Sequence, residues 1–494
     1  MTMKKYILSL DQGTTSSRAI LFDHQGQARF IAQREIQCLY PHPGWVEADA
    51  LSIWVSIIDV INEVLIKANI TMNEVDSIGL SNQRETTIVW NKETGMPIYH
   101  AVIWQSRQSS DICEKYESKK EFIHQKTGLL INPYFSASKI RFILDHVPGS
   151  QKQAEKGELL FGTIDSWLIY KMTKGKVHAT DVSNASRTLL FNINTMMWDK
   201  ELCDLFNIPL KMLPSVKPSS YNYGIAKFFH PEITIRGVAG DQQAALFGQT
   251  CFDKGESKNT YGTGCFMLLN TGENPIFSHA GLLTTVAWQI GDQVTYALEG
   301  SVFVGGAVVQ WLRDEVKLID KASDSEHLAL HCEDTEGLYF VPAFVGLGTP
   351  YWDDDARGAI VGITRGTNKN QIVRAALEGI AYQCKDVFQV MNRETKCSVK
   401  SLRVDGGATA NRYLMQFQSD ILQIDIMLPV CLETSALGAA YLAGLDSGFY
   451  QSISEIKRIH SYQAVFHSQM TKAEIARRYQ GWKHAIKAVR TFKN

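Results

Sequence analysis

The sequence predicts a two-domain α/β protein in which one fold occurs twice. Short apolar strands alternate with amphipathic helical segments along the chain, as is typical of α/β architecture. A turn rich in glycine and hydroxyl side chains follows an apolar run near the N-terminus, and a weaker echo of it appears at 259–266. A length of 494 residues suffices for two domains. Because the two similar turns lie about half a chain apart, we place the domain boundary near residue 250 and predict domains 1–250 and 251–494.

Composition limits the classes of function. The net charge of -1 gives no bulk attraction to nucleic acid or to an anionic membrane surface. The nine cysteines include no Cys-x-x-Cys pair, which favours reduced thiols over a disulfide framework or a zinc site. The first apolar run ends at Asp11, too early for a signal peptide, and no apolar stretch is long enough for a membrane span. We therefore expect a cytoplasmic protein.

The first turn has the features of a phosphate-binding loop. Residues 6–10 and 19–22 read as two strands, and the turn between them carries Asp11, Gly13 and four consecutive hydroxyl side chains. Backbone amides and hydroxyls directed at one point bind anions such as nucleotide phosphates, and Asp11 could hold a hydrated Mg²⁺ beside them. An ordinary polar turn is the alternative that this segment alone leaves open.

Two charged neighbours follow the next predicted strand. Residues 53–66 have helical periodicity, 77–81 read as a strand, and Arg84 and Glu85 come just after that strand. On a regular strand the two side chains would face opposite sides, but beyond its end they can converge. A guanidinium fork and a carboxylate together suit a vicinal diol. A surface salt bridge is the alternative.

Three further residues are weaker candidates. Trp104 could cover the carbon chain of a ligand, or pack in a core. Tyr134 could donate its hydroxyl, or simply pack. His230 lies in a predicted loop, where an exposed histidine without a function is the alternative.

Asp241 is the catalytic candidate. It lies between the strand-like run 233–238 and a predicted helix that starts at Gln242. Aspartate is a favoured helix N-cap, so capping alone would explain it. The helix dipole also favours an ionised carboxylate there, and such a group can accept the proton of an alcohol that attacks ATP. The sequence alone leaves cap and base open.

Three glycine turns in the second half could complete a nucleotide site. The echo hairpin contains Gly262-Thr263-Gly264, with Phe266 behind it. Gly305-Gly306 opens a predicted helix over 307–312, and Gly406-Gly407 follows a predicted strand over 402–404. Adjacent glycines at a strand end let a flat ligand lie against the backbone. Each turn alone fits a tight connection equally well. A further helix is predicted over 372–387.

These motifs together resemble the FGGY carbohydrate kinases. The ones that carry the resemblance occur in the family's order: 11–18, 83–87, Trp104, 240–243, 261–264, 405–407 and 438–444. The likeness extends from about Tyr6 to the region of 481–483. It implies the actin-like, ribonuclease-H-like ATPase fold, duplicated into two domains that flank a catalytic cleft.

The resemblance also implies an activity and its residues. The chain closely resembles those family members that use ATP and Mg²⁺ to phosphorylate glycerol to sn-glycerol 3-phosphate, and the resemblance implies Asp241 as general base. The implied glycerol-site residues are Arg84, Glu85, Trp104, Tyr134, Asp241, Gln242 and Phe266. The implied nucleotide-site residues are Thr14, Thr15, Ser16, Arg18, Thr263, Gly306, Gln310, Gly407 and Asn411. Asp11 matches the residue near Mg²⁺.

Two other functions are the alternatives. One is a kinase of the same family for another polyol or sugar, such as xylulose. The other is an actin- or chaperone-like ATPase that switches a protein partner. The latter would need a peptide-binding domain, and the chain after Gly444 has only a helical tail.

The resemblance bears on regulation and assembly as well. Certain relatives bind fructose 1,6-bisphosphate through a glycine- and arginine-rich loop, and the matching stretch 226–236 lacks adjacent glycines. Others carry a phosphorylatable histidine there, and His230 lies at a similar distance after Gly224. His230 is therefore a candidate for phosphorylation by a phosphotransferase-system carrier protein. The family also implies a homodimer or homotetramer.

Overall fold

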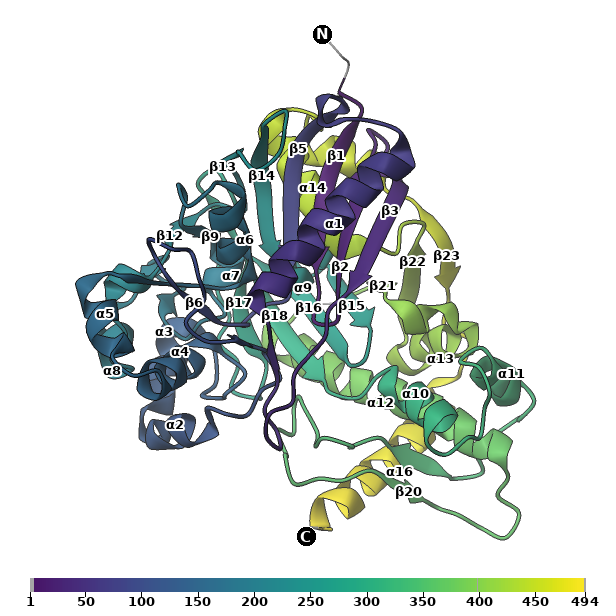
Figure 1. The fold of residues 1–494 in the computed structure, drawn as a ribbon. Coiled ribbons are helices and arrows are strands. Elements are labelled where there is room, and N and C mark those ends of the chain that lie inside the picture. The colour runs from purple at the N-terminus through teal and green to yellow at the C-terminus, as the bar shows by residue number, and fades with distance from the viewer. Residues whose placement is uncertain (1–3, 398, 493–494) are drawn as a thin grey trace.

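The computed structural model describes residues 4–397 and 399–492. Within them, one mixed sheet of thirteen strands runs through the molecule, and helices cover both of its faces (Figure 1). The strands of its first half are β1 (Tyr6–Gln12), β2 (Ser16–Phe22), β3 (Ala28–Glu35), β5 (Val75–Asn82), β13 (Ser220–Ala226) and β14 (Ile233–Gly240). The strands of its second half are β15 (Ser257–Tyr261), β16 (Cys265–Gly272), β17 (Leu283–Ile290), β18 (Gln293–Val302), β21 (Ser401–Asp405), β22 (Asp425–Pro429) and β23 (Tyr462–Phe466).

The strand order confirms the predicted duplication. The first half runs β13-β14-β5-β1-β2-β3, and the second runs β23-β22-β21-β15-β16-β18. Parallel and antiparallel pairings match at every corresponding step, and the hairpins β1–β2 and β15–β16 occupy equivalent places. Strand β17 joins the halves through its single parallel pair with β13. The internal echo in the sequence therefore reflects two copies of one topology.

Four helices pack on the two halves of the sheet in equivalent positions. They are α1 (Ala50–Ala68), α9 (Asp241–Gly248), α12 (Lys369–Thr395) and α14 (Thr434–Ser447). Helix α1 packs on β2 and β3, and α12 packs on β16 and β18. The predicted helices at 53–66 and 372–387 are confirmed, and both extend further, because Asp49 and Asn368 cap their starts.

Helices α9 and α14 exchange sides. Helix α9 follows β14 of the first half but also packs on β15, β16 and β17, and α14 follows β22 of the second half but packs on β5, β14 and β1. The two helices contact each other through glycines. A Cβ atom at Gly438 would overlap the Ala244 carbonyl oxygen, and one at Gly248 would overlap that of Thr434. Only glycine permits this approach, which joins the halves at their centre.

The remaining α-helices are distributed over both halves. They are α2 (Ser110–Lys115), α3 (Lys120–Thr127), α4 (Ser136–His146), α5 (Ser150–Lys156), α6 (Ile164–Met172), α7 (Val182–Ala185), α8 (Lys200–Leu205), α10 (Ala307–Asp314), α11 (Asp324–Leu330), α13 (Arg412–Leu422), α15 (Ile453–Ile459) and α16 (Lys472–Thr491). The short strands are β4 (Glu47–Ala48), β6 (Ile88–Asn91), β7 (Ala101–Val102), β8 (Leu159–Gly162), β9 (Ala179–Asp181), β10 (Phe191–Asn192), β11 (Met197–Trp198), β12 (Ser215–Lys217), β19 (Tyr339–Val341) and β20 (Ala359–Val361). Across the described ranges, no helix is long and apolar enough to cross a membrane.

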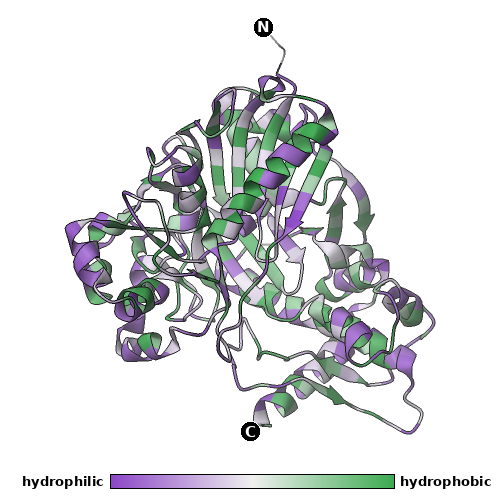
Figure 2. Cartoon of the chain, in the orientation of Figure 1, coloured by the Kyte–Doolittle hydropathy of each residue, from purple (hydrophilic) through white to green (hydrophobic). Residues whose placement is uncertain are grey.

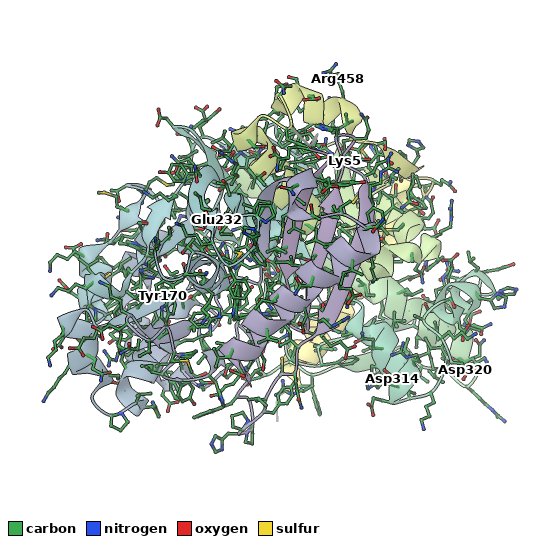
Figure 3. All side chains as sticks on the ribbon, turned by 45° about the horizontal axis from the view of Figure 1, so that its top comes forward. Lys5, Tyr170, Glu232, Asp314, Asp320 and Arg458 are labelled. Atoms are coloured by element: carbon green, nitrogen blue, oxygen red, sulfur yellow. The ribbon has the colours of Figure 1, made fainter. Side chains whose placement is uncertain are left out.

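Polarity follows the layers. Hydrophobic residues concentrate along the central strands, whereas the peripheral helices α2, α5 and α8 are largely hydrophilic (Figure 2). Charged side chains such as Lys5, Glu232, Asp314 and Arg458 project at the periphery (Figure 3). Each half has its own apolar core, and a third apolar cluster around α9 and α14 joins them. Charged side chains inside this frame therefore need a specific explanation.

The close contact between α9 and α14 is testable. We expect Gly438→Ala to lower the free energy of unfolding by about 2–3 kcal/mol, since its Cβ would push the two helices apart. Gly366→Ala is the matched control, because this exposed glycine has only Thr364 Oγ1, at 3.8 Å, near its Cβ position. Urea denaturation of both variants measures the effect. Equal stability of the two would contradict the packing described.

Candidate functional site

Arg84 and Glu85 converge where strand β5 ends. Both follow the last β5 residue, Asn82, and Glu85 has a positive φ of 61°. Arg84 Nε lies 3.8 Å from Glu85 Oε1 and 3.2 Å from Asp241 Oδ1. Their exposed fractions are 3% for Arg84 and 1% for Glu85, so the alternative of a surface salt bridge is wrong. The structure thus gathers three of the predicted acceptor residues at one point.

Asp241 begins helix α9 without capping it. The N-cap is Gly240, so the alternative in which Asp241 serves only as the helix cap is wrong. Its carboxylate instead lies beside Arg84 and accepts a hydrogen bond from the Gln242 backbone N–H at 2.7 Å. The Asp241 side chain is 29% exposed, unlike the buried Arg84. It is therefore an accessible carboxylate in the positive potential of a guanidinium and a helix N-terminus.

A cluster of aromatic rings lies beside these polar groups, with the Tyr134 ring centroid 5.8 Å from the guanidinium carbon of Arg187. The Trp104 ring makes edge-to-face contacts with Tyr134 at a centroid distance of 5.4 Å and with Phe266 at 6.3 Å. Trp104 Nε1 donates to Thr14 Oγ1 at 2.8 Å. The tryptophan is only partly buried, and it packs at the margin of the N-terminal core. It therefore links the predicted acceptor wall directly to the first phosphate hairpin.

Gln242 is held by a lysine that the sequence did not single out. Lys258 Nζ donates to Gln242 Oε1 and, at 2.8 Å, to Thr260 Oγ1. Burial lowers the pKa of Lys258 to about 8, although the nearby carboxylates of Asp405 and Asp241 oppose the shift. The second half of the chain thus reaches into the acceptor site.

Two further charged residues were missed. Arg187 Nε donates to Glu85 Oε1 at 2.6 Å, and Glu299 Oε1 accepts from Arg84 Nη2 at 3.0 Å and from Arg187 Nη2 at 3.1 Å. Burial opposes ionisation of Glu299, but Arg187 and Arg84 outweigh it and lower the pKa of Glu299 to about 2. A signal existed for Glu299, which is the single charge in the strand 293–302. Arg187 had none.

The first hairpin has the predicted shape. The Gly13 backbone N–H donates to the Ser16 carbonyl at 2.9 Å and closes the turn, while Asp11 pairs with Arg18 across β1 and β2. Arg18 Nη1 lies 2.8 Å from Glu433 Oε2, so its charge is already partnered. Thr15 is exposed at the tip.

Asp11 is the residue predicted to lie near a divalent cation. Burial raises the pKa of its carboxyl to about 6, and the neighbouring carboxylates of Glu433 and Asp241 add to the rise while Arg18 opposes it. This local excess of negative charge is what a bound cation would balance. Among the described residues, no cluster of three or more metal-ligating side chains exists. Such a cation would therefore take most of its ligands from phosphates and water.

The glycine turns of the second half meet around the second hairpin. The Gly305 N–H donates to the Thr263 carbonyl at 2.7 Å, and the Gly306 N–H donates to the Gly262 carbonyl at 2.8 Å. Gly406 has a φ of 93° and packs against the Tyr261 backbone, where no Cβ would fit. A Cβ at Gly407, in contrast, would meet open space. The three turns thus form one backbone surface with room beside it.

Two predicted nucleotide residues lie on the helices that leave these turns. Gln310 is exposed in the first turns of α10, whose N-cap is Gly306. Asn411 is the N-cap of α13, where its side chain accepts from the Leu414 N–H at 2.9 Å and donates to Ser325 Oγ at 3.1 Å. Asn411 therefore has a structural role of its own, beside any ligand contact.

His230 lies away from this site. It is exposed in the loop between β13 and β14, at the start of β14, whereas Asp241 follows the end of that strand. A strand of eight residues spans roughly 25 Å, which separates the two. The structure does not bring His230 together with the acceptor residues.

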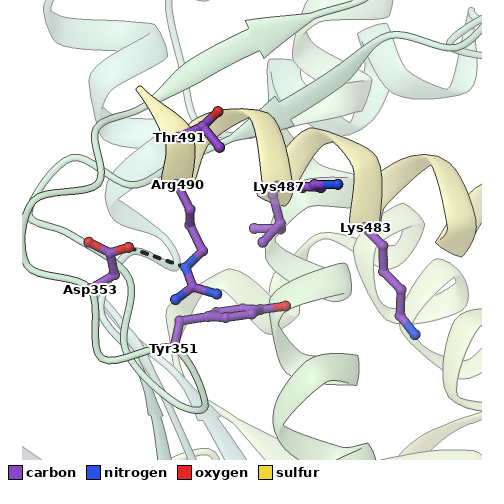
Figure 4. Close-up of a pocket in the computed structure, with 7 residues that line it drawn as sticks. Tyr351, Asp353, Lys483, Lys487, Arg490 and Thr491 are labelled. Carbon is purple, nitrogen blue, oxygen red and sulfur yellow. Dashed lines mark hydrogen bonds and ion pairs between the residues drawn. The ribbon is translucent and has the colours of Figure 1, made fainter. Parts of the chain in front are cut away.

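A pocket of about 490 Å³ lies elsewhere, beside helix α16 (Figure 4). Its lining residues are Tyr351, Asp353, Lys483, Ile486, Lys487, Arg490 and Thr491. Arg490 Nε lies 3.2 Å from Asp353 Oδ2 across it. None of the predicted site residues lines this pocket, so it is separate from the site at α9.

The duplicated sheet and its paired hairpins define a two-domain α/β protein with the actin-like ATPase fold. Residues 6–248 match the N-terminal domain of the FGGY family of carbohydrate kinases, and residues 257–447 match its C-terminal domain. The chain belongs to the FGGY family of carbohydrate kinases. The boundary at residue 250 stays a prediction.

Individual relatives within this family differ in how similar they are to the chain. The chain is 56% identical over 495 residues to a glycerol kinase of Halalkalibacterium halodurans, covering 99% of this chain and 100% of that one. It is 54% identical over 495 residues to one of Listeria monocytogenes, with the same coverage. A crystal structure of Plasmodium falciparum glycerol kinase with ADP has a TM-score of 0.92 at 38% identity, covering 99% and 98% of the two chains. A xylulose kinase from Lactobacillus acidophilus, at 22% identity, shares the fold, with a TM-score of 0.87 and coverage of 98% and 97%.

Proposed function

We propose that this protein transfers the γ-phosphoryl group of ATP to a terminal hydroxyl of glycerol, giving sn-glycerol 3-phosphate and ADP. The observation that carries the proposal is the division of the acceptor site. Arg84, Glu85 and Asp241 form its polar side, and the rings of Trp104 and Phe266 form its apolar side. A small triol presents hydroxyls on one side and carbons on the other. Full-length identity of 54–56% to glycerol kinases supports the same substrate.

Asp241 is the proposed general base. Its carboxylate is accessible, and the Arg84 guanidinium 3.2 Å away fixes its orientation. In phosphoryl transfer the proton of the acceptor leaves late, so a carboxylate that receives it in the transition state is sufficient. Arg84 and Glu85 orient the acceptor by donating to and accepting from its hydroxyls.

The nucleotide side is supplied by both hairpins. Amides and hydroxyls of Thr14, Thr15 and Ser16 and the open surface at Thr263 and Gly407 suit phosphates and a flat base. Mg²⁺ near Asp11 would neutralise charge on the transferred phosphoryl group. The hydrogen bond from Trp104 to Thr14 holds the acceptor wall against the phosphate hairpin, which favours in-line transfer.

Three expectations from the sequence stay predictions. They are a homodimer or homotetramer, a cytoplasmic location, and phosphorylation of His230 by a phosphotransferase-system carrier protein. Exposure of His230 is compatible with the last.

A substrate panel tests the proposed acceptor. With ATP and Mg²⁺ we expect glycerol to give a kcat/KM at least about 100-fold above those for xylulose and gluconate, because the longer chains of these acceptors would clash with the aromatic side of a site that fits three carbons. ADP release measured with each compound provides the comparison. Turnover of xylulose with none of glycerol would replace the proposal with the sugar-kinase alternative. ATP hydrolysis that no acceptor stimulates would favour the ATPase switch.

Asp241→Asn tests the base. We expect kcat to fall by a factor of about 10²–10⁴, because the amide cannot take the proton, while glycerol affinity changes little. Calorimetric titration with glycerol and steady-state kinetics measure the two effects. Asp324→Asn, which alters a partly exposed acid at the start of α11, is the matched control. Near wild-type turnover of Asp241→Asn would sink the base assignment.

A further inference from the structure

Glu299 is a fully buried carboxylate for which the proposed chemistry has no use. Its exposed fraction is 0%, as is that of its partner Arg187. Burying charges is costly, and a well-packed apolar group in the same place is often as stable as a buried ion pair. Stability alone therefore gives little reason for a glutamate here, and the roles of its partners suggest another one.

The ion pairs of Glu299 cross between the two halves of the chain. Glu299 lies on β18, within residues 257–447 that match the C-terminal family model. Both of its partners, Arg84 and Arg187, lie within 6–248. The sequence separations are 215 and 112 residues. This carboxylate is thus a contribution of the second half to a cluster built by the first.

The geometry connects Glu299 to the whole polar side of the acceptor site. Its two carboxylate oxygens accept hydrogen bonds from both terminal nitrogens of Arg84, which leaves Arg84 Nε to face Asp241 Oδ1. Glu299 Oε1 also accepts a hydrogen bond from Arg187 Nη2, and Arg187 Nε donates a hydrogen bond to Glu85 Oε1. One carboxylate therefore fixes the guanidinium planes that orient both Glu85 and Asp241.

A second contact repeats the arrangement. Lys258, on β15 of the second half, donates to the side-chain oxygen of Gln242, another predicted acceptor residue. The acceptor site thus depends at two points on strands of the other half.

We propose that Glu299 is a positioning residue, which holds Arg84 and, through Arg187, Glu85 in the orientation that binds glycerol, so that acceptor affinity depends on the seating of the second half against the first. This inference rests on the proposed function. It differs from a purely structural role in one measurable respect. A structural ion pair, once weakened, lowers stability, whereas a positioning residue also lowers affinity for the acceptor and spares the nucleotide.

Glu299→Gln tests the proposal, because glutamine keeps the shape but loses the charge that both arginines share. We expect the KM for glycerol to rise about tenfold or more and the KM for ATP to stay within about twofold. The reason is that the substitution removes charge-assisted hydrogen bonds that orient the acceptor site and leaves the nucleotide site unchanged. Glu299→Asp keeps the charge on a shorter side chain, and we expect its glycerol KM to lie between those of the wild type and Glu299→Gln. If Glu299→Gln does not fold, Glu299→Asp alone decides: a glycerol KM raised about threefold or more supports the proposal.

Asp386→Asn is the matched control. Asp386 is also a buried acid of the second half, 4% exposed, and accepts hydrogen bonds from Tyr479 and Trp482 of α16. We expect it to lower the thermal unfolding midpoint without changing either KM. A glycerol KM in the soluble Glu299 variant that stays within about twofold of wild type, or that rises no more than in Asp386→Asn, would overturn the proposal. Failure of the proposed function would appear separately, as a wild-type protein that does not phosphorylate glycerol.

Discussion

The buried guanidinium of Arg84 is the contact on which the acceptor site depends. It is bonded to Glu299 and lies within 3.8 Å of Glu85 and 3.2 Å of Asp241. A cation removed from water must be paired, and here carboxylates from a strand end, a helix start and a distant strand all pair with it. Because each partner lies on a different element, the position of Arg84 determines how those elements meet.

The fold explains why such a site arises at this place. Two copies of one sheet topology lie side by side, and α9 and α14 each pack across onto the other copy. Helix α9 therefore carries Asp241 and Gln242 to the boundary between the halves, where Lys258 and Glu299 of the second half can reach them and their neighbours. The glycines at 248 and 438 make this close approach possible.

Much of this could be predicted from the sequence, for a physical reason. The phosphate hairpins, Arg84-Glu85 and Asp241 all lie at strand ends or helix starts, where local sequence and local geometry coincide. The strands around 6–10, 19–22, 77–81, 233–238 and 402–404 and the helices α1 and α12 also follow from local patterns, although the capped helices start earlier than predicted. For Asp241 the sequence leaves capping and base catalysis open, and the structure has Gly240 as the N-cap of α9 while the Asp241 carboxylate lies beside Arg84.

Contacts that span the chain could not be predicted in the same way. Glu299, Arg187 and Lys258 meet the acceptor residues only after the sheet has assembled, and no local pattern marks their partners. Of these three residues, only Glu299 stands out in the sequence, as the single charged residue of the strand 293–302. The resemblance implies residues that are expected to contact ligands, but not those that hold such residues in place.

A crystal structure with glycerol and a non-hydrolysable ATP analogue tests the central claim most directly. The account predicts glycerol hydroxyls within about 3 Å of Arg84, Glu85 and Asp241, with the carbons against Trp104 and Phe266 and one terminal hydroxyl facing the γ-phosphate. Glycerol bound away from Asp241, or a γ-phosphate directed away from it, would contradict the account.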